Sequence, residues 1–259
     1  MHAAGNDYVY FEQNEVSDEE LPELSKQICD RHKSVGADGI IALTKTQGGI
    51  IFKMFNADGS EGRICGNGIR CAAAFAARYM GMRSPIKFFT LAGERTVSVE
   101  TIKGKTVATA EMGEPKEFIS SEYFAEKLQE IGLYVNKRDV FAINVGNDHA
   151  VFFSGLPLSF AAKETEKTGL FPCGINVECA GIIGSGIKAE VFERGSGETL
   201  SCGSGAVAIV YAAVISKRAT EGQYTDVCMP GGNLAVKISG GKAFLKGEVN
   251  EVFKGEYEI

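Results

Sequence analysis

Short runs of alternating or β-branched residues recur along the chain, bounded by Gly, Asn and Asp. Four of them are "IIFKMFN" (50–56), "RTVSVETI" (95–102), "TVATAEM" (106–112) and "KAEVFER" (188–194). Alternation with period two over such lengths indicates strands that turn one face towards a core. The hydrophobic pattern therefore predicts a protein made mostly of sheet.

Two apolar stretches depart from this pattern. "IRCAAAFAARYM" (69–80) and "AVAIVYAAVI" (206–215) are apolar nearly all round, which predicts helices buried inside their own sheets. "SKR" closes the second helix, where basic side chains suit the negative end of the helix dipole. More polar helices are predicted at 121–132 and at 18–32, the latter with Ser17 as its cap and Glu19 and Glu20 in its first turn.

Each buried helix follows a Cys-Gly-x-Gly turn, and both turns belong to a longer internal repeat. "MFNADGSEGRICGNG" (54–68) aligns without a gap on "VFERGSGETLSCGSG" (191–205), at an offset of 137. "GNDYVYF" (5–11) aligns on "GNDHAVF" (146–152) at 141, and "VGADGII" (35–41) aligns on "VECAGII" (177–183) at 142. Two copies so far apart indicate a duplicated domain and not a solenoid.

The repeat also predicts where the chain divides. "MGEPKE" (112–117) contains a proline and leads out of the first copy, so the boundary is expected near it. We expect a first half at 1–113, to which the last strand (248–259) returns, and a second half at 114–247.

Composition narrows the functional classes. The 259 residues are 44% hydrophobic, enough for one large domain or two ordinary ones, and 27 basic against 33 acidic residues give a net charge of −6. The sequence has no cluster of basic residues of the kind that binds a phosphate backbone, so a nucleic-acid partner is not expected. The longest uncharged apolar stretch (206–215) is too short to span a bilayer, and the N-terminus lacks the layout of a signal peptide. We expect a cytoplasmic protein that acts on a small molecule, with no membrane partner.

The seven cysteines are an odd number scattered over the whole chain, which is unlike a secreted disulfide framework. They are expected to be reduced. No Cys-x-x-Cys pair occurs and the three histidines have no ligand spacing, so no metal site is expected. Cys71 is interpreted as a core residue, and four cysteines are interpreted as structural or incidental: Cys29, Cys173, Cys179 and Cys228.

Cys65 and Cys202 stand immediately before the two helices. A helix N-terminus lowers the pKa of a thiol and so favours the thiolate. Its amide groups also bind a carboxylate, and the glycines let a ligand approach the backbone. Inverting a tetrahedral carbon needs one group to remove a proton and another, on the opposite face, to deliver one. The matched pair therefore predicts an inversion chemistry that uses no cofactor. The alternative is that both cysteines are small hydrophobes beside ordinary turns.

"FNADGSE…CGNGIRC" and "ERGSGETLSCGSGA", together with "GNDY" near the start, resemble the diaminopimelate epimerase family over nearly the whole chain. These are pyridoxal-independent, two-cysteine enzymes that convert L,L-diaminopimelate to the meso form on the way to lysine and peptidoglycan. The resemblance implies an α/β (α+β) fold of two pseudo-symmetric domains. Each would be a curled, mainly antiparallel sheet around a central helix, with the active site between them. It also implies a homodimer.

By motif, the resemblance makes Cys65 and Cys202 the catalytic pair. The amides of Gly66, Asn67, Gly203 and Ser204 would surround the proximal carboxylate of the substrate. The rest of the substrate would be bound by Asn6, Asn56, Asn147, Asn176, Glu193 and Arg194. Arginine can grip a carboxylate with two parallel hydrogen bonds and glutamate can accept from an ammonium. Asp7 and His149 are interpreted as scaffold.

Three features depart from the family pattern. The chain begins at Met1-His2, where the family usually has several more residues. Asp148-His149-Ala150 stands where the family reads Pro-His-Cys, which adds a carboxylate that would favour a cationic side chain in the substrate. Gly39 leaves unfilled a contact that some members make with glutamine.

Two alternatives to the epimerase remain. Asp148 motivates a racemase of the same fold that acts on another amino acid, such as histidine or lysine. A non-catalytic ligand-binding or thiol-redox protein would use the cysteines differently and would catalyse no exchange of an α-proton.

Overall fold

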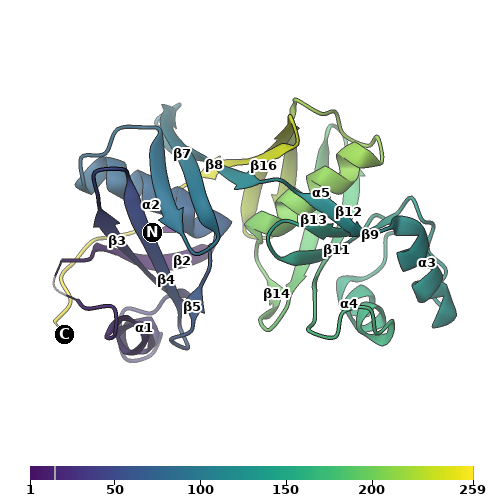
Figure 1. Ribbon diagram of the computed structural model, residues 1–259, viewed down its shortest axis with the longest axis horizontal. Helices are drawn as coiled ribbons and strands as arrows, with labels where there is room; N and C mark the ends of the chain where they lie inside the picture. The colour runs from purple at the N-terminus through teal and green to yellow at the C-terminus, as the bar shows by residue number, and fades with distance from the viewer. Residues whose placement is uncertain (15, 259) are drawn as a thin grey trace. The chain divides into compact units, whose positions relative to one another are not determined.

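The computed structural model describes residues 1–14 and 16–258. The chain forms two compact units, the first of Met1–Glu111 with Lys246–Ile259 and the second of Met112–Leu245. It leaves the first unit along β8 (Lys105–Gly113) and returns along β17 (Lys242–Glu248). Each unit combines a mainly antiparallel set of strands with one central helix (Figure 1), so the predicted α/β class is confirmed.

In the first unit, β2 and β3 pair in parallel, as do β4 and β6. Five pairs are antiparallel: β1–β2, β3–β4, β4–β5, β6–β7 and β7–β8. The long helix α2 lies behind β4 and β7 in Figure 1 and packs against β7. The remaining elements of this unit are β1 (His2–Ala3), β2 (Asn6–Glu12), α1 (Leu21–Cys29), β3 (Gly39–Lys45), β4 (Ile50–Asn56), β5 (Glu61–Gly62), α2 (Gly66–Tyr79), β6 (Ile86–Thr90) and β7 (Gly93–Ile102).

The second unit repeats this plan. Parallel pairing occurs between β11 and β12 and between β13 and β15, and α5 packs against β10, β11, β12 and β16. Its elements are β9 (Lys116–Ile119), α3 (Ser121–Glu130), β10 (Val140–Asn144), β11 (Asp148–Phe152), α4 (Leu158–Lys167), β12 (Asn176–Ile183), β13 (Gly186–Glu193), β14 (Gly197–Thr199), α5 (Gly203–Ile215), β15 (Tyr224–Met229) and β16 (Gly232–Ser239).

Strand register corrects one block of the predicted repeat. Ile40 lies opposite Phe55, and Val177 lies opposite Phe192. Both residues of the second pair are therefore 137 positions after those of the first. The alignment of 35–41 on 177–183 at an offset of 142 is wrong, because β3 begins at Gly39 and its true counterpart begins at Asn176. Identical residues suggested that alignment, but the backbone pairing of the strands determines which residues correspond.

The two buried helices are confirmed, and each begins three residues before the predicted apolar run. The glycine turn itself forms the first helical turn in both cases. The predicted basic end of the second helix is wrong, since α5 ends at Ile215 and Lys217 has a left-handed backbone (φ 63°). Arg218 instead binds the Asp139 carboxylate and the carbonyl oxygen of Arg138.

The surface helices differ from prediction at their ends. Helix α1 covers Leu21–Cys29 and not 18–32, and its N-cap is Glu20. The predicted cap, Ser17, instead donates its backbone N–H to the Glu20 carboxylate at 2.8 Å. Helix α3 begins as predicted, with the Ser120 hydroxyl accepting from the Tyr123 N–H, and ends at Glu130. Helix α4 was not predicted.

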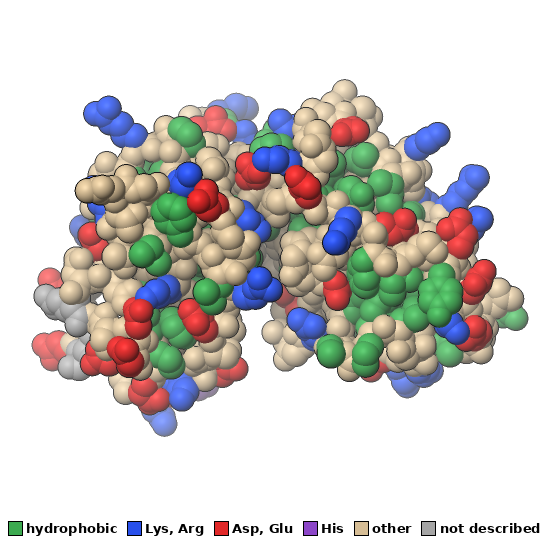
Figure 2. All heavy atoms as spheres, viewed as in Figure 1, with side chains coloured by type: hydrophobic (Ala, Val, Ile, Leu, Met, Phe, Trp, Pro, Cys, Tyr) green, Lys and Arg blue, Asp and Glu red, His purple; other side chains and the backbone are tan. Residues whose placement is uncertain are grey.

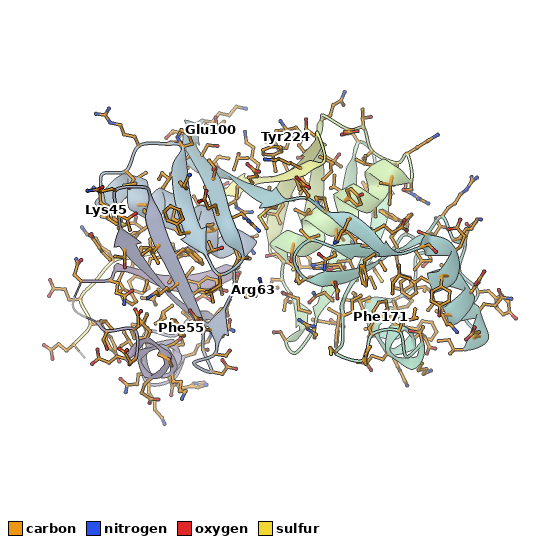
Figure 3. The ribbon with its side chains drawn as sticks, in the orientation of Figure 1. Lys45, Phe55, Arg63, Glu100, Phe171 and Tyr224 are labelled. Carbon is orange, nitrogen blue, oxygen red and sulfur yellow. The ribbon has the colours of Figure 1, made fainter. Side chains whose placement is uncertain are left out.

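Each unit also has a smaller hydrophobic cluster beneath its surface helices. Phe55, at the end of β4, packs with Leu21, Leu24 and Ile28 of α1, and Phe171 packs on the cluster that includes Leu158 of α4 (Figure 3). Acidic and basic side chains are interspersed on the face drawn in Figure 2. Among the residues that the structure describes, no helix is long and apolar enough to cross a membrane.

Candidate active-site residues

Cys65 and Cys202 are the N-cap residues of α2 and α5. The Cys65 sulfur accepts the Gly68 N–H at 3.3 Å, and the Cys202 sulfur accepts the Gly205 N–H at 3.4 Å. Both cysteines have an extended backbone, with φ −127° and −130°. Because the first amides of a helix have no intrahelical acceptor, each turn presents N–H groups that suit an anion. We call each cysteine, its glycine turn and the side chains beside them a cysteine site.

In the cysteine site of the first unit, the thiol of Cys65 donates to the Asn6 side-chain oxygen at 3.1 Å, and the Asn6 amide donates to Asp38 at 2.7 Å. Arg31 binds Asp38 at 2.9 Å and Asp7 at 2.6 Å. Burial alone would raise the pKa of Asp7, but its hydrogen bond and charge contact with Arg31 hold that pKa below its usual value. The structure thus brings the predicted residue Asn6 to Cys65 and places Asp7 in the scaffold beneath it.

The start of α2 also carries a buried cation. Arg70 is fully buried and donates to the Asn67 side-chain oxygen at 2.9 Å, while its Nε and Nη1 have no partner among the described residues. Burial lowers the pKa of Arg70. Neighbouring Cys71 lies in the core, as predicted, and burial raises its pKa to about 11. The Tyr8 hydroxyl forms a hydrogen bond with Cys65. Burial is the largest of the effects that raise the pKa of Tyr8.

Cys202 is only 6% exposed. Burial, followed by the charges of Glu193 and Glu178, raises the pKa of Cys202 well above its usual value. Hydrogen bonds from Ser204 and Gly205 oppose this shift. The expectation that this helix start lowers the thiol pKa is therefore wrong for Cys202, because desolvation and two carboxylates outweigh the helix dipole.

Glu178 is a residue that sequence reasoning missed. Its side chain is completely buried, and Oε1 lies 2.6 Å from Nδ1 of the equally buried His149. Its Oε2 has no hydrogen-bond partner among the described residues, and burial raises its pKa. The other ring nitrogen of His149 lies 3.1 Å from the Asn147 oxygen. A lone acid at a buried position of the strand β12 was the signal that could have revealed it.

Asn176 and Arg194 lie together in the second unit. The Asn176 amide donates to the carbonyl oxygen of Asp148 at 2.8 Å, and its oxygen accepts the backbone N–H of Arg194 at 3.0 Å. The Arg194 side chain is exposed, and its guanidinium donates to the Cys173 carbonyl oxygen at 3.4 Å. Its guanidinium is thus available to a ligand. Glu193 accepts from the Thr199 hydroxyl at 2.6 Å.

Asn56 occupies the position in the first unit that Glu193 occupies in the second. Its side-chain amide donates to the Ser60 hydroxyl at 2.9 Å, and its backbone carbonyl oxygen accepts from the Ser25 hydroxyl at 2.7 Å. The first bond holds the turn between β4 and β5, and the second, to the backbone carbonyl, joins α1 to the end of β4. Both leave the side-chain oxygen of Asn56 available to a ligand.

Asp148 and Gly39, two positions that depart from the expected motifs, have structural roles. The Asp148 carboxylate accepts from the Asn144 amide at 2.6 Å across the β10–β11 hairpin, which anchors the turn that carries Asn147. A Cβ on Gly39 would lie 2.3 Å from the Phe55 carbonyl oxygen and 2.9 Å from the Tyr8 ring. Glycine is therefore required there by close packing.

Comparison with known proteins agrees with these motifs. The family model "Diaminopimelate epimerase" matches residues 1–118 and 141–252. A protein named diaminopimelate epimerase from Archaeoglobus fulgidus is 35% identical, with 98% of this chain and 94% of that protein aligned. A protein of the same name from Bacillus cereus is 33% identical, with 100% and 96% aligned.

Solved structures support the fold. A phenazine biosynthesis protein of the PhzF family from Bacillus anthracis superposes with a TM-score of 0.68 at 16% identity, covering 96% of this chain and 93% of that one. A predicted epimerase from Pseudomonas aeruginosa gives 0.67 at 13% identity, covering 94% and 90%. At such identities the likeness concerns the fold alone. The sequence matches, which span both units and both cysteine turns, show that the chain belongs to the diaminopimelate epimerase family.

Proposed function

We propose that this protein is an isomerase that epimerises L,L-diaminopimelate to meso-diaminopimelate, with Cys65 and Cys202 as its two acid/base groups. The observation that carries the proposal is that each unit holds a cysteine as the N-cap of its buried central helix. In the reaction, the thiolate of one cysteine takes the α-proton, and the thiol of the other gives a proton to the opposite face of the same carbon. The roles reverse with the stereoisomer bound.

The difficulty of the reaction is the weak acidity of the α-proton. Amides at the two helix starts, at Gly66-Asn67 and Gly203-Ser204, suit the α-carboxylate and the negative charge that develops next to it. Since the donors are fixed by the helices, they need no reorganisation when that charge appears. This stabilisation would take the place of a pyridoxal cofactor.

The remaining predicted residues would bind the two amino-acid ends of the substrate. Arg194 suits the distal carboxylate and Glu193 the distal ammonium. Asn176, which holds the backbone of Asp148 and Arg194, would position the arginine. The other asparagines would orient the substrate through their side-chain amides: Asn6, Asn56 and Asn147.

We further propose that the two units are the two epimerase halves, that the protein works as a homodimer, and that it acts in the cytoplasm. The resemblance to the family supports the homodimer, and light scattering of the purified protein tests it. The chemistry supports the compartment, because a reducing environment keeps Cys65 and Cys202 from oxidation.

The test is exchange of the α-proton in deuterated water. The protein is incubated with L,L-diaminopimelate and, separately, with L-histidine and L-lysine, and deuterium at the α-carbon is followed by NMR. We expect deuterium and the meso isomer only with diaminopimelate. Cys65→Ser and Cys202→Ser should each abolish steady turnover, whereas Cys228→Ser, which removes an exposed thiol, serves as the matched control.

Other outcomes select the alternatives. Exchange with histidine or lysine but not with diaminopimelate would make the protein a racemase of another amino acid. Absence of exchange with every amino acid would favour a binding or thiol-redox protein. Wild-type rates in both serine variants would refute the two-cysteine mechanism.

A further inference from the structure

The hairpins that precede the two cysteines each end their first strand in a polar side chain. Asn56 ends β4 and Glu193 ends β13, and each strand is followed by a short returning strand, β5 or β14 (Figure 1). The two residues are counterparts at the offset of 137 that the strand pairing shows, and both are half-buried. A hydroxyl group from the same hairpin holds each of them.

In the second unit the hydroxyl belongs to Thr199, which donates to Glu193 Oε1 at 2.6 Å. Thr199 pairs with Val191 across the hairpin, and Gly197 pairs with Glu193. Thr199 and Glu193 therefore lie diagonally on one face of the pair, where their side chains can meet. Oε2 of Glu193 accepts no hydrogen bond from the described part of the chain, so it can accept from a ligand.

In the first unit the hydroxyl belongs to Ser60, and its hydrogen is already used. The Ser60 hydroxyl donates to Asp58 Oδ1 at 2.5 Å, and this hydrogen bond is the largest of the effects that lower the pKa of Asp58. Because a hydroxyl has a single hydrogen, Ser60 can only accept from Asn56, at 2.9 Å. The NH₂ group of Asn56 therefore faces Ser60, and its oxygen is the end left for a ligand.

The two hydroxyls come from positions that do not correspond. At the offset of 137, Ser60 corresponds to Gly197 and Thr199 corresponds to Gly62. Gly197 has a left-handed φ of 78°, which favours glycine. A Cβ on Gly62 would lie 2.8 Å from the end of the Met54 side chain. Each hairpin thus disfavours a hydroxyl-bearing residue at the position that the other uses. The hydroxyl contact is common to both hairpins although the shared backbone does not impose it.

We propose that Thr199 is a positioning residue for Glu193 and that Ser60 is a positioning residue for Asn56. Each hydroxyl fixes its partner with one oxygen atom turned to an ammonium group of the ligand. A side chain that is already held loses less conformational freedom on binding than one that moves freely. This inference rests on the proposed function for the identity of the ligand, a diamino acid, and not for the hydrogen bonds.

The first test needs no substrate. Three-bond NMR couplings report the side-chain rotamer of Glu193 in isotope-labelled protein. We expect a single rotamer in the wild type and in Thr199→Ser, which keeps the hydroxyl, and averaged couplings in Thr199→Val, which replaces it with a methyl group. Thr220→Val changes an exposed threonine of the same unit and is the matched control. Averaged couplings in the wild type, or a single rotamer in Thr199→Val, would overturn the proposal whether or not the protein is an epimerase.

The second test separates positioning from a general structural effect. Thr199→Val should raise KM for L,L-diaminopimelate about three- to tenfold, the effect of ordering one free side chain. It should leave kcat unchanged, because the substrate and the transition state lose the same interaction. Thr199→Ser should restore KM. As a competitive inhibitor, L-2-aminopimelate, which lacks the second amino group, should bind the wild type and Thr199→Val equally well.

Equal losses with both compounds, or an unchanged KM in Thr199→Val, would contradict the role of Thr199. A wild-type protein that does not turn over diaminopimelate would refute the proposed function, and the couplings would still decide the role of Thr199.

Ser60→Ala tests the first unit. Without the hydroxyl, the side-chain amide protons of Asn56 should exchange faster with solvent, and KM should rise in the same range. Ser98→Ala, which changes an exposed serine of β7, is the matched control. An unchanged exchange rate of the Asn56 amide in Ser60→Ala would refute the role of Ser60.

Discussion

Alanine at the third position of the two central helices should have unequal effects. In a helix, alanine is ordinarily favoured over glycine by about 1 kcal/mol. In Gly205→Ala the new methyl group would lie 2.7 Å from Glu178 Oε1, and that oxygen cannot retreat without losing its 2.6 Å contact with His149. Overpacking of this kind costs about 1–3 kcal/mol, and the held carboxylate favours the upper part of that range, about 2–3 kcal/mol. After the gain of about 1 kcal/mol from alanine, the net destabilisation should be about 1–2 kcal/mol. In Gly68→Ala the obstacle at 2.8 Å is the end of the Ile41 side chain, which can rotate, so the effects should nearly cancel.

Differential scanning calorimetry measures the contrast. About 2–4 °C per kcal/mol applies to domains of this size, so Gly205→Ala should lower Tm by about 2–8 °C and Gly68→Ala by less than about 2 °C. Gly205→Ala should also lower turnover more, because its methyl group displaces the N–H donor of Cys202. A Gly205→Ala protein as stable as wild type would show that the buried carboxylate moves freely and would refute the packing argument.

Two further predictions concern charge and burial. Arg31→Gln should lower Tm by the equivalent of about 1 kcal/mol or less at pH 7, since the ion pair is partly exposed. The pKa of Asp7 is lower in the folded protein than in the unfolded chain, so this contribution is present above the unfolded pKa of ~3.9 and is lost as the pH falls through the lower folded pKa. Tm curves of the two proteins that do not begin to converge as the pH falls below ~3.9 would contradict this. Iodoacetamide at pH 8 should modify exposed Cys173 and spare buried Cys71, whose pKa is raised to about 11, and peptide mass spectrometry showing equal labelling would exclude that burial.

The sequence predicted the elements whose signal is local. Alternation located the strands 50–56 and 106–112 within one residue of their bounds, and uniform apolarity located the two central helices. The sequence-based prediction was wrong about the start of α1, whose N-cap is Glu20 and not Ser17. It also missed α4, whose buried face is set by packing against β12 and β13.

The residues of the candidate site also fall into those that the sequence predicted and those that it did not. The cysteine turns could be recognised from sequence because their glycines and spacing repeat. Glu178 could not, because its importance comes from a fully buried contact with His149 and from its approach to the turn before Gly205. The erroneous offset of 142 had also hidden that its counterpart is Ile41.

The linear order of residues alone determined that a duplicated α/β protein carries two cysteines, each before an apolar helix, and that it resembles one family. Those features are local or periodic, so they can be recognised from the residues that lie close together in the sequence. Only tertiary structure decided the acidity of Cys202 and the buried charges that distinguish the two turns. Electrostatic effects depend on distance through space and on exclusion of water, and the residues responsible are brought together by strand register from positions far apart in the chain.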